Sequence, residues 1–412
     1  MQRSIKVLAI MAGATLLCLT LASTVQAQNA GTIVTPASSI QRPEDLGLRA
    51  HTNFHIFVPN VVPGVRNDSS VPPPNAETPA SLACVYKLVT QVSGCPIHGT
   101  TLNPTGGFGA VAIVDAFDNP FAEQDLAAYS TQFGLPSCTK ANGCFQQVYA
   151  NGTQPRNDPG GWSLEIALDI EMAHAFAPNA KIILVEAGSN SFADLYHAED
   201  VAGQMVAAAG GGTVTNSWSG GEYSGETSDD SHFKVNKVVY FASTGDSGAP
   251  EGYPAASPFV VAAGGTSIGR SGGNFTTETG WSGSGGGPSI YEPRPAYQNL
   301  IQSIVGTKRG TPDFSFDANP ATGVAMYDLD GGIQWLQIGG TSVSSPALAG
   351  IVNAAGHHAT STQQELGGLY PYAKNHYTQV WRDITSGSNG HPCTTGWDFV
   401  TGIGTPITLV GK

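Results

Sequence analysis

Ser342 has the surroundings of a nucleophile. It lies in the segment Gly339-Gly-Thr-Ser-Val-Ser-Ser-Pro346, where two glycines precede it and an apolar run follows. The glycines predict a tight loop that brings the hydroxyl group to the first turn of an apolar helix. Backbone N–H groups at such a position stabilise negative charge that develops on a substrate oxygen. Ser342 is therefore a candidate nucleophile, although a serine in this place can also act only as a helix cap.

A serine nucleophile needs a base, and two acidic residues are spaced to provide one. Glu165 and Asp169 stand at positions i and i+4 of the segment 163–176, which we expect to be helical, so their carboxyl groups share one helix face. The apolar residues around them are Leu164, Ile166, Ala167, Leu168 and Ile170. Two anions about 5 Å apart at an effective dielectric constant of about 20 repel each other by about 3 kcal/mol, which corresponds to about two pKa units.

At least one of these two carboxyl groups should then keep its proton into mildly acidic solution. Such a pair can act as a base at an acidic pH, where histidine is protonated. The alternative is a buried helix on which Glu165 and Asp169 meet basic partners from elsewhere in the fold.

Asp246 is a candidate for stabilising an oxyanion. It lies in Ser243-Thr-Gly-Asp-Ser-Gly248, directly after the apolar run 237–242. Sites in parallel sheets gather at the carboxyl ends of the strands, so this side chain can face a cleft. A protonated aspartic acid can donate a hydrogen bond to an oxyanion. An aspartate between glycines is also common in plain turns.

The histidines offer a weaker choice of base for Ser342. His98, Asp115 and Ser342 stand in segments similar to the catalytic segments of subtilisins, but subtilisins have the chain order Asp, His, Ser. His98 also lies close to Cys95, in a segment that we expect to be a loop. A neutral, histidine-dependent subtilase is therefore kept as an alternative.

The elements that must position these side chains alternate between strands and helices. Ser163 is a candidate cap for the helix that carries Glu165, and Pro178 is its expected stop. The apolar runs typical of buried strands are 110–115, 181–186, 213–218, 237–242 and 259–263, and the helical patterns are 163–176 and 193–209. Short strands separated by helices predict an α/β fold, with a mostly parallel sheet covered by helices on both faces.

The composition is typical of an exported protein. Residues 1–27 contain two cations, an apolar stretch and the small-residue sequence Val25-Gln-Ala27, the pattern of a cleaved signal peptide; an uncleaved membrane anchor is the alternative. Loss of Arg3 and Lys6 with this segment changes the formal net charge from −13 to −15, which argues against nucleic acid as a partner. No later segment has about 18 consecutive apolar residues, so we expect no membrane contact after cleavage.

The low charge density suits an acidic medium. Only 12% of the residues are charged, so acidification removes negative charge without creating a large positive charge. Of the cysteines, Cys84 with Cys95 and Cys138 with Cys144 form close pairs, which predict short disulfide loops in an oxidising compartment. Cys393 is left over, and nothing around it indicates a nucleophile.

Six motifs in this chain resemble those of the sedolisins, the kumamolisin-like family of serine-carboxyl peptidases. The match runs from about residue 105 to 406. Its strongest motifs are Glu165-x-x-x-Asp169, Asn216-Ser-Trp-Ser219, Ser243-Thr-Gly-Asp-Ser-Gly248, Tyr253-Pro-Ala-Ala-Ser-Pro258, Pro312-Asp-Phe-Ser315 and Gly339-Gly-Thr-Ser342.

The resemblance implies a subtilisin-like fold and a role for each residue of the site. Ser342 would be the nucleophile, Glu165 its general base, Asp169 the residue that orients Glu165, and Asp246 the oxyanion-hole acid. Substrate-binding residues would be Ser217, Trp218 and Ser219, which would hold an extended peptide along its backbone while Trp218 shields the site.

The resemblance also implies a C-terminal calcium loop in residues 381–404. The ligands of one structural Ca²⁺ would be the side chains of Asp383 and Asp398 and the backbone carbonyls of Ile384, Thr394 and Gly396. Thr394 stands where the family usually has glycine, so this carbonyl requires a backbone angle that a β-branched residue can adopt.

These features predict a signal peptide at residues 1–27, a Pro-rich arm at 28–80 and a single peptidase domain at 81–412. The arm is far shorter than the folded pro-domain of typical sedolisins, so it is expected to be clipped off, to stay on as a strap, or to reflect folding without such a domain. The expected function is that of a secreted, extracellular or periplasmic, acid-active endopeptidase, a monomer that hydrolyses polypeptides through an acyl-enzyme on Ser342. A catalytically silent, calcium-stabilised binding protein of the same fold is the alternative.

Overall fold

The computed structural model describes residues 31–60, 70–332, 334–356 and 359–412. The expected signal peptide, residues 1–27, therefore lies outside the described residues. Across the described ranges, no helix combines the length and the apolar character that crossing a membrane requires.

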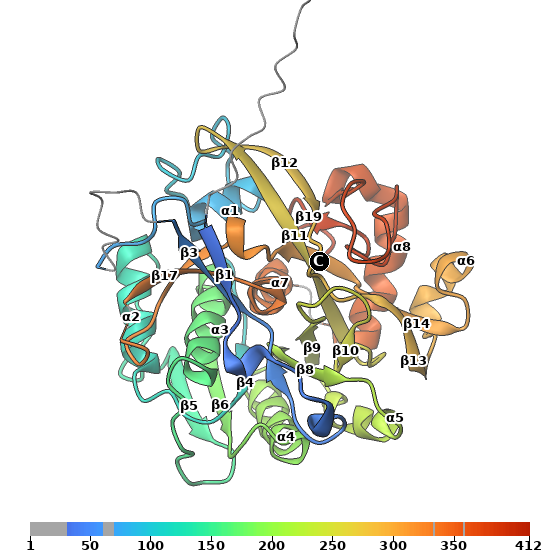
Figure 1. The fold of residues 1–412 in the computed structure, drawn as a ribbon, viewed down its shortest axis with the longest axis horizontal. Helices are drawn as coiled ribbons and strands as arrows, with labels where there is room; N and C mark the ends of the chain where they lie inside the picture. The colour runs from blue at the N-terminus through green and yellow to red at the C-terminus, as the bar shows by residue number, and fades with distance from the viewer. Residues whose placement is uncertain (1–30, 61–69, 333, 357–358) are drawn as a thin grey trace, which may run out of the picture.

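A sheet of eight strands, most of them parallel, forms the centre of the fold (Figure 1). The strand order is β12-β11-β9-β7-β4-β6-β5, and β15 pairs with β11. β12 is antiparallel to β11, whereas the other pairs are parallel. The strands are β4 (Ala110–Ala116), β5 (Phe145–Tyr149), β6 (Lys181–Ala187), β7 (Gly212–Asn216), β9 (Val238–Ser243), β11 (Val260–Ser271), β12 (Asn274–Gly280) and β15 (Phe314–Asp317).

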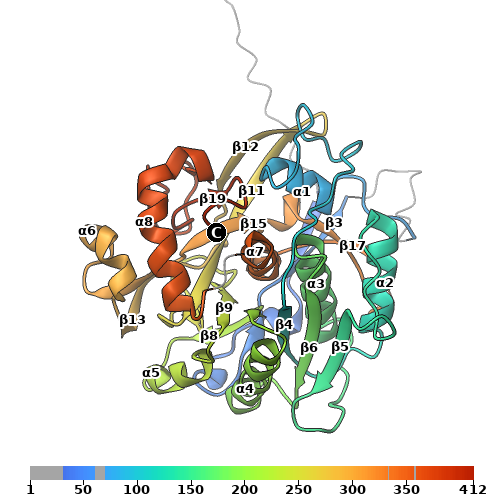
Figure 2. The same ribbon diagram turned by 180° about the vertical axis from the view of Figure 1, so that it is seen from behind.

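Helices cover both faces of this sheet, as predicted, and β4 shows why. Successive side chains of a strand point to opposite faces. Val111 and Ile113 pack in a cluster with residues of α3 (Trp162–Phe176), whereas Ala112 and Val114 pack in another with residues of α4 (Phe192–Ala208). On the α3 side, α7 (Thr341–Ala355) lies beside α3 in both views (Figures 1 and 2). The helices that carry Glu165 and Ser342 are therefore neighbours.

The predicted strand 213–218 is divided in two. β7 ends at Asn216, and β8 (Trp218–Gly221) leaves the central sheet to pair with β10 (Gly252–Tyr253) and β2 (His51–Thr52). The prediction of one continuous strand was wrong because an apolar run does not reveal where a strand changes its partners.

The prediction that Ser163 caps α3 was also wrong. The N-cap residue is Gly161, and the Asp158 carboxylate accepts the N–H of Trp162 at 3.2 Å. Ser163 lies inside the first turn of α3, so its hydroxyl group cannot take the cap position. The helix ends at Phe176, before Pro178, as expected.

The N-terminal arm lies against the domain. β3 (His55–Pro59) pairs with β1 (Gly31–Val34) on one side and with β17 (Trp335–Gly339) on the other, and β17 also pairs with β16 (Val324–Tyr327). Figure 1 shows the arm in blue, crossing in front of α7 and α3. Because β17 leads directly to the loop before Ser342, this small sheet joins the arm to the loop that carries Ser342.

The remaining elements surround this framework. They are α1 (Pro79–Val85), α2 (Ala122–Phe133), α5 (Glu226–Asp229), α6 (Gln302–Val305), α8 (Thr362–Val380), β13 (Gly287–Pro293), β14 (Lys308–Thr311), β18 (Trp381–Arg382), β19 (Thr405–Pro406) and five 3₁₀ turns among the described residues: Ala37–Ser39, Pro43–Asp45, Asp230–Phe233, Ala296–Ile301 and Pro320–Thr322.

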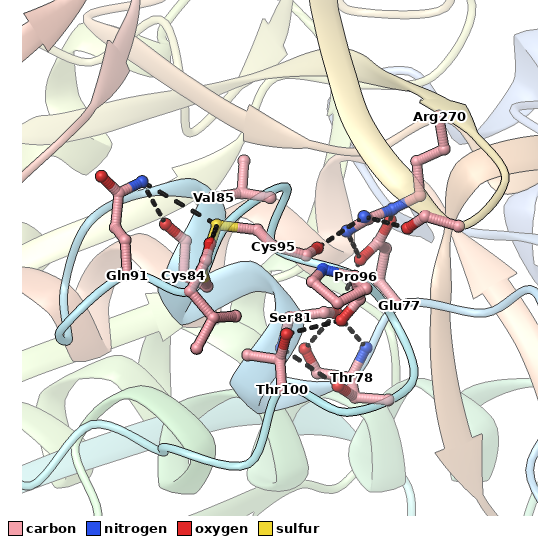
Figure 3. The surroundings of a disulfide bond; sticks show 12 residues. Glu77, Thr78, Ser81, Cys84, Val85, Gln91, Cys95, Pro96, Thr100 and Arg270 are labelled. Carbon is pink, nitrogen blue, oxygen red and sulfur yellow. Dashed lines mark hydrogen bonds and ion pairs between the residues drawn. A yellow bond between two sulfur atoms is a disulfide. The ribbon is translucent and has the colours of Figure 1, made fainter.

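Both predicted disulfides are present. Cys84 pairs with Cys95 and Cys138 with Cys144, while Cys393 is a buried free thiol. Around the first disulfide, Arg270 donates to the Cys95 carbonyl at 2.8 Å and forms an ion pair with Glu77 (Figure 3). These contacts join the loop after α1 to the end of β11.

Candidate active site

The loop before α7 holds Ser342 at the start of the helix, as predicted. Gly340 is the N-cap residue, with φ of +132°, a conformation that residues with a side chain rarely adopt. A Cβ atom at Gly340 would lie 2.2 Å from the Asn53 carbonyl oxygen and 2.4 Å from Asp246 Oδ2. Gly340 therefore lets the loop before Ser342, the arm and Asp246 meet in one place.

Ser342 is hydrogen-bonded to a carboxyl group. Its Oγ donates to Glu165 Oε2 at 2.9 Å, and it also lies 3.3 Å from the Ser217 carbonyl oxygen. No histidine among the described residues accepts a hydrogen bond from this hydroxyl group. The geometry is that of a serine whose proton can pass to Glu165.

Glu165 and Asp169 are fully buried on α3, and a third buried acid, Asp115 near the end of β4, lies close enough for its charge to affect Glu165. Burial raises the pKa of Glu165 well above its usual value, and the charges of Asp169 and Asp115 raise it further. Burial likewise raises the pKa of Asp169; Ser217 and Glu165 are close enough to offset part of this rise, but neither meets the geometry of a hydrogen bond to Asp169.

Basic residues do not neutralise this cluster. Across the described residues, no Lys, Arg or His side chain forms an ion pair with Glu165, Asp169 or Asp115. Several buried carboxyl groups close together without a cation must share protons, because full ionisation would leave unpaired charges in a medium of low dielectric constant. The cluster can therefore accept a proton and return it within one reaction cycle.

Asp246 lies beyond the end of β9, as predicted, and its carboxyl group contacts Thr341, the residue before Ser342. Its Oδ1 accepts hydrogen bonds from the backbone N–H and the hydroxyl group of Thr341, each at 2.8 Å. Its Oδ2 has no hydrogen-bond partner among the described residues, and His55 Nε2 lies 3.6 Å from it. Burial raises the pKa of Asp246 to about 8, so its free oxygen carries a proton in acidic and neutral solution.

The three residues predicted to bind substrate follow one another beside Ser342. Thr52 of the arm pairs with Trp218, and the backbone of β8 faces the arm. The Trp218 side chain is buried, and its Nε1 donates to the Val114 carbonyl at 2.9 Å. Trp218 therefore pairs with the arm through its backbone, while the hydroxyl group of Ser219 accepts a hydrogen bond from Asn53 Nδ2.

The predicted calcium ligands gather in one loop between β18 and β19. Asp383 accepts the N–H of Gly396 at 3.1 Å, and Asp398 accepts the N–H of Thr394 at 2.9 Å. The Ile384 side chain packs with Cys393 and Val400 beneath the loop.

Within the described part of the chain, neither Asp383 nor Asp398 forms an ion pair. Asp398 is buried and Asp383 is partly buried, and carboxylates without a cationic partner suit a hard cation such as Ca²⁺. Asp383 and Asp398 thus have the chemistry that the expected Ca²⁺ requires.

The sequence did not predict that four further residues lie at this site: Asn53, His55, Thr341 and Asp115. Thr341 stands inside the Gly-Gly-Thr-Ser motif, and a hydroxyl group next to the nucleophile was a signal that could have been used. Asp115 was considered only as a subtilisin-like aspartate. Asn53 and His55 lie in the arm, where nothing in the local pattern indicates contact with a site almost 300 residues later in the chain.

The chain was compared with known proteins. No family model matches it. It is 30% identical over 370 residues to kumamolisin of Bacillus sp. (strain MN-32), covering 82% of this chain and 63% of kumamolisin. It is 34% identical over 169 residues to sedolisin of Pseudomonas sp. (strain 101), covering 37% of this chain and 28% of that relative. It is 28% identical over 358 residues to tripeptidyl-peptidase 1 of Dictyostelium discoideum, covering 75% and 55%. The chain thus spans less than two thirds of each relative.

Solved structures show the same fold. Pseudomonas sedolisin, a serine-carboxyl proteinase complexed with two molecules of pseudo-iodotyrostatin, matches with a TM-score of 0.63 and 24% identity, over 81% of this chain and 95% of that one. Sphericase matches with a TM-score of 0.51 and 19% identity, over 74% and 94%. The fold is the subtilisin-like α/β fold that the sequence predicts. Together with the relatives above, this makes the chain a homologue of the sedolisin family.

Proposed function

We propose that this chain is a secreted, acid-active serine-carboxyl endopeptidase that hydrolyses polypeptides. The observation that carries the proposal is the 2.9 Å hydrogen bond from Ser342 Oγ to Glu165 Oε2, in a cluster of buried carboxyl groups beside Asp246. Relatives named kumamolisin, sedolisin and tripeptidyl-peptidase 1 support the same reaction class. Two disulfides support an oxidising compartment outside the cytoplasm.

In the proposed reaction, Ser342 Oγ attacks the scissile carbonyl carbon while Glu165 takes the hydroxyl proton. The Ser342 N–H and the protonated Asp246 donate hydrogen bonds to the oxyanion that forms. Glu165 then passes the proton to the leaving amine, and the peptide bond breaks. Water, deprotonated by Glu165, hydrolyses the ester on Ser342 and restores the enzyme.

The proposed working pH follows from the protonation states that this cycle requires. Glu165 must be free to accept a proton, which sets the acidic limit, and its buried neighbour Asp169 must keep its own proton so that Glu165 does not face a second negative charge. Asp246 must be protonated to donate, which sets the alkaline limit, since its pKa is raised to about 8. A histidine base would lose activity over the acidic range in which this arrangement operates.

The test is an assay of the purified chain on acid-denatured protein from pH 3 to 8, with Ser342→Ala as the matched variant. We expect hydrolysis in acidic solution that declines towards pH 8 and is absent from Ser342→Ala, with internal peptide bonds cut as judged by mass spectrometry of the products. No hydrolysis at any pH would favour the silent binding protein. Release of tripeptides alone would contradict the assignment as an endopeptidase.

We also propose that one Ca²⁺ binds at Asp383 and Asp398, with the carbonyl groups of Ile384, Thr394 and Gly396. Bound Ca²⁺ would hold together a loop that otherwise has little regular structure. A ligand at 100 times its Kd stabilises the folded state by about 2.7 kcal/mol, which corresponds to a shift in Tm of about 5 °C. We therefore expect EDTA to lower Tm by about that amount and added Ca²⁺ to restore it.

Scanning calorimetry of the wild type and Asp398→Asn measures this effect. The variant should have a lower Tm and should respond to neither EDTA nor Ca²⁺. An equal response in Asp398→Asn would place the ion elsewhere, and no response in the wild type would remove the calcium proposal.

Buried carboxyl groups outside the catalytic site should make the fold more stable in acid. Burial raises the pKa of Asp125, Glu186 and Glu292 to about 8 and that of Glu251 to about 7. Between about pH 4 and about pH 8 the folded chain therefore binds more protons than the unfolded chain, so the free energy of unfolding falls as the pH rises through this window.

We expect Tm, measured by calorimetry at constant ionic strength and saturating Ca²⁺, to decrease steadily from pH 4 to pH 8. Glu186→Gln removes one of these titrating groups and should make the decrease shallower. A Tm that increases over the same range would contradict the raised pKa values.

A further inference from the structure

The arm of this chain occupies the place where an extended substrate would lie. β2 pairs with β8 in antiparallel register, His51 with Ser219 and Thr52 with Trp218. The next residue, Asn53, donates its N–H to the Ser217 carbonyl at 3.2 Å. The resemblance to the sedolisins implies that residues 217–219 bind an extended peptide along its backbone, and in this chain the arm occupies these backbone groups.

The carbonyl group of Asn53 lies where a scissile carbonyl group must lie. Its oxygen accepts the Ser342 N–H at 3.0 Å, at the N-terminus of α7. The same oxygen and Asp246 Oδ2 both lie against Gly340, as the distances from a Cβ atom at Gly340 show. The N–H of Asn53 is also 3.2 Å from Glu165 Oε2, the atom that accepts the Ser342 hydrogen bond. Nucleophile, base and oxyanion donors thus all surround the peptide bond between Asn53 and Phe54.

The Asn53 side chain is held as specifically as its backbone. Its Nδ2 donates to Ser243 Oγ at 2.7 Å and to Ser219 Oγ at 3.0 Å, and the residue is 1% exposed. A buried amide matched by two hydroxyl groups is a built subsite, because a side chain without polar atoms would leave both hydroxyl groups unpaired.

The chain is anchored on both sides of this bond. Before it, β2 is paired with β8; after it, β3 is paired with β17, with His55 opposite Gly339. The Ser39 hydroxyl group further donates to the Phe54 carbonyl at 2.9 Å. The Asn53–Phe54 bond is therefore presented to Ser342 in a fixed and extended form.

We propose that the chain cleaves its own Asn53–Phe54 bond, and that the contacts of Asn53 identify the residue that the enzyme prefers before the bond it cuts. This inference rests on the proposed peptidase function. A bond forms between Ser342 Oγ and the Asn53 carbonyl carbon as Glu165 takes the hydroxyl proton. The bond from that carbon to the Phe54 nitrogen breaks as the nitrogen receives this proton, and one water then hydrolyses the ester. The products are a carboxyl group on Asn53 and an amino group on Phe54.

The cut would not by itself free the cleft. β1 still pairs with β3 after the cut, and β2 still pairs with β8, so the amino-terminal piece stays attached by these strands. Cleavage should therefore be seen under denaturing conditions, and access to other substrates should depend on loss of this piece. Ser219 and Ser243 become specificity-determining residues for an asparagine side chain.

The first experiment follows the intact chain in acidic solution by denaturing electrophoresis, intact mass and amino-terminal sequencing. We expect a new amino terminus at Phe54 and fragments whose masses sum to that of the chain plus one water. The rate should not change on dilution, because the reaction is intramolecular. Ser342→Ala and Glu165→Gln should stay whole, and their circular dichroism spectra and Tm values verify that they fold.

A chain that digests added protein yet leaves Asn53–Phe54 intact, or cuts itself at another bond, would overturn this inference and leave the proposed function standing. A chain that cuts neither itself nor any added peptide would remove both.

The second experiment compares the peptide His-Thr-Asn-Phe-His-Ile with the same peptide carrying leucine in place of asparagine, using the full chain after its own cut and peptide in excess over the bound amino-terminal piece. We expect the asparagine peptide to have the higher kcat/KM, and Ser243→Ala to reduce this preference about tenfold, since one buried hydrogen bond is lost. Ser267→Ala is the matched control. Ser267 lies on the neighbouring strand β11, and its hydroxyl oxygen accepts a hydrogen bond from Asn319. Equal kcat/KM for the two peptides in the wild type would overturn the subsite.

Discussion

Replacing Glu165 with glutamine should lower kcat/KM on a protein substrate by about a thousandfold. The amide can still accept a hydrogen bond from Ser342, but it cannot take the proton, and loss of a general base costs about 10² to 10⁴ in rate. The shape of the side chain is nearly unchanged, so the fold should survive. The effect should appear mainly in kcat, because Glu165 acts on the transition state and not on peptide binding.

A matched control lies on the same helix. Glu171 is also fully buried on α3, but its carboxyl group accepts the backbone N–H of Tyr327, away from Ser342. Glu171→Gln should keep activity close to that of the wild type, although its Tm can change. If Glu165→Gln retained a tenth of the wild-type rate, the base would have to be sought elsewhere.

Asp246 should show a different response to two substitutions. Asp246→Ala removes the donor that faces Gly340 and should lower kcat by about 10² to 10³. Asp246→Asn supplies an amide donor at the same place, while its oxygen can still accept from Thr341. We therefore expect Asp246→Asn to keep a substantial fraction of the activity.

The pH profile separates the two substitutions further. In the wild type, activity should fall as the pH rises through about 8, because the Asp246 proton is lost and a negative charge then faces the developing oxyanion. Asp246→Asn does not ionise, so this alkaline fall should move or disappear while the acidic limb set by Glu165 stays in place. Steady-state kinetics from pH 3 to 9 test this, and an unchanged alkaline limb in Asp246→Asn would show that another group sets it.

Much of the catalytic site could be predicted because its residues are positioned by short segments. The i, i+4 spacing of Glu165 and Asp169 places both on one face of α3, and the two glycines before Ser342 require a tight entry into α7. Asp246 follows a strand end, where side chains of a parallel sheet meet. The disulfides were predicted for the same reason, since short loops bring their cysteines together.

The break between β7 and β8 and the cap of α3 could not be predicted in this way. Asp158 rather than Ser163 satisfies the first turn of α3, and an apolar run does not reveal that β8 changes sheets after Ser217. Both features depend on where the neighbouring loops run. The raised pKa of Asp246 could not be predicted from the local sequence either, because it comes from burial, and His55 of the arm and Thr341 lie against this carboxyl group.

Residue types and their local spacing thus indicated Ser342, the Glu165–Asp169 pair and Asp246 as candidates and predicted the α/β fold, whereas the calcium loop was an expectation from the resemblance to the sedolisins. The position of the arm was decided by long-range packing. Asn53 reaches Ser342 only because β2 pairs with β8, which begins 166 residues after Thr52, and β3 pairs with β17, 280 to 284 residues later in the chain. Strand pairing over such a distance follows from the summed contacts of the whole fold, so no local pattern in the Pro-rich arm could reveal that this segment lies in the cleft as a peptide.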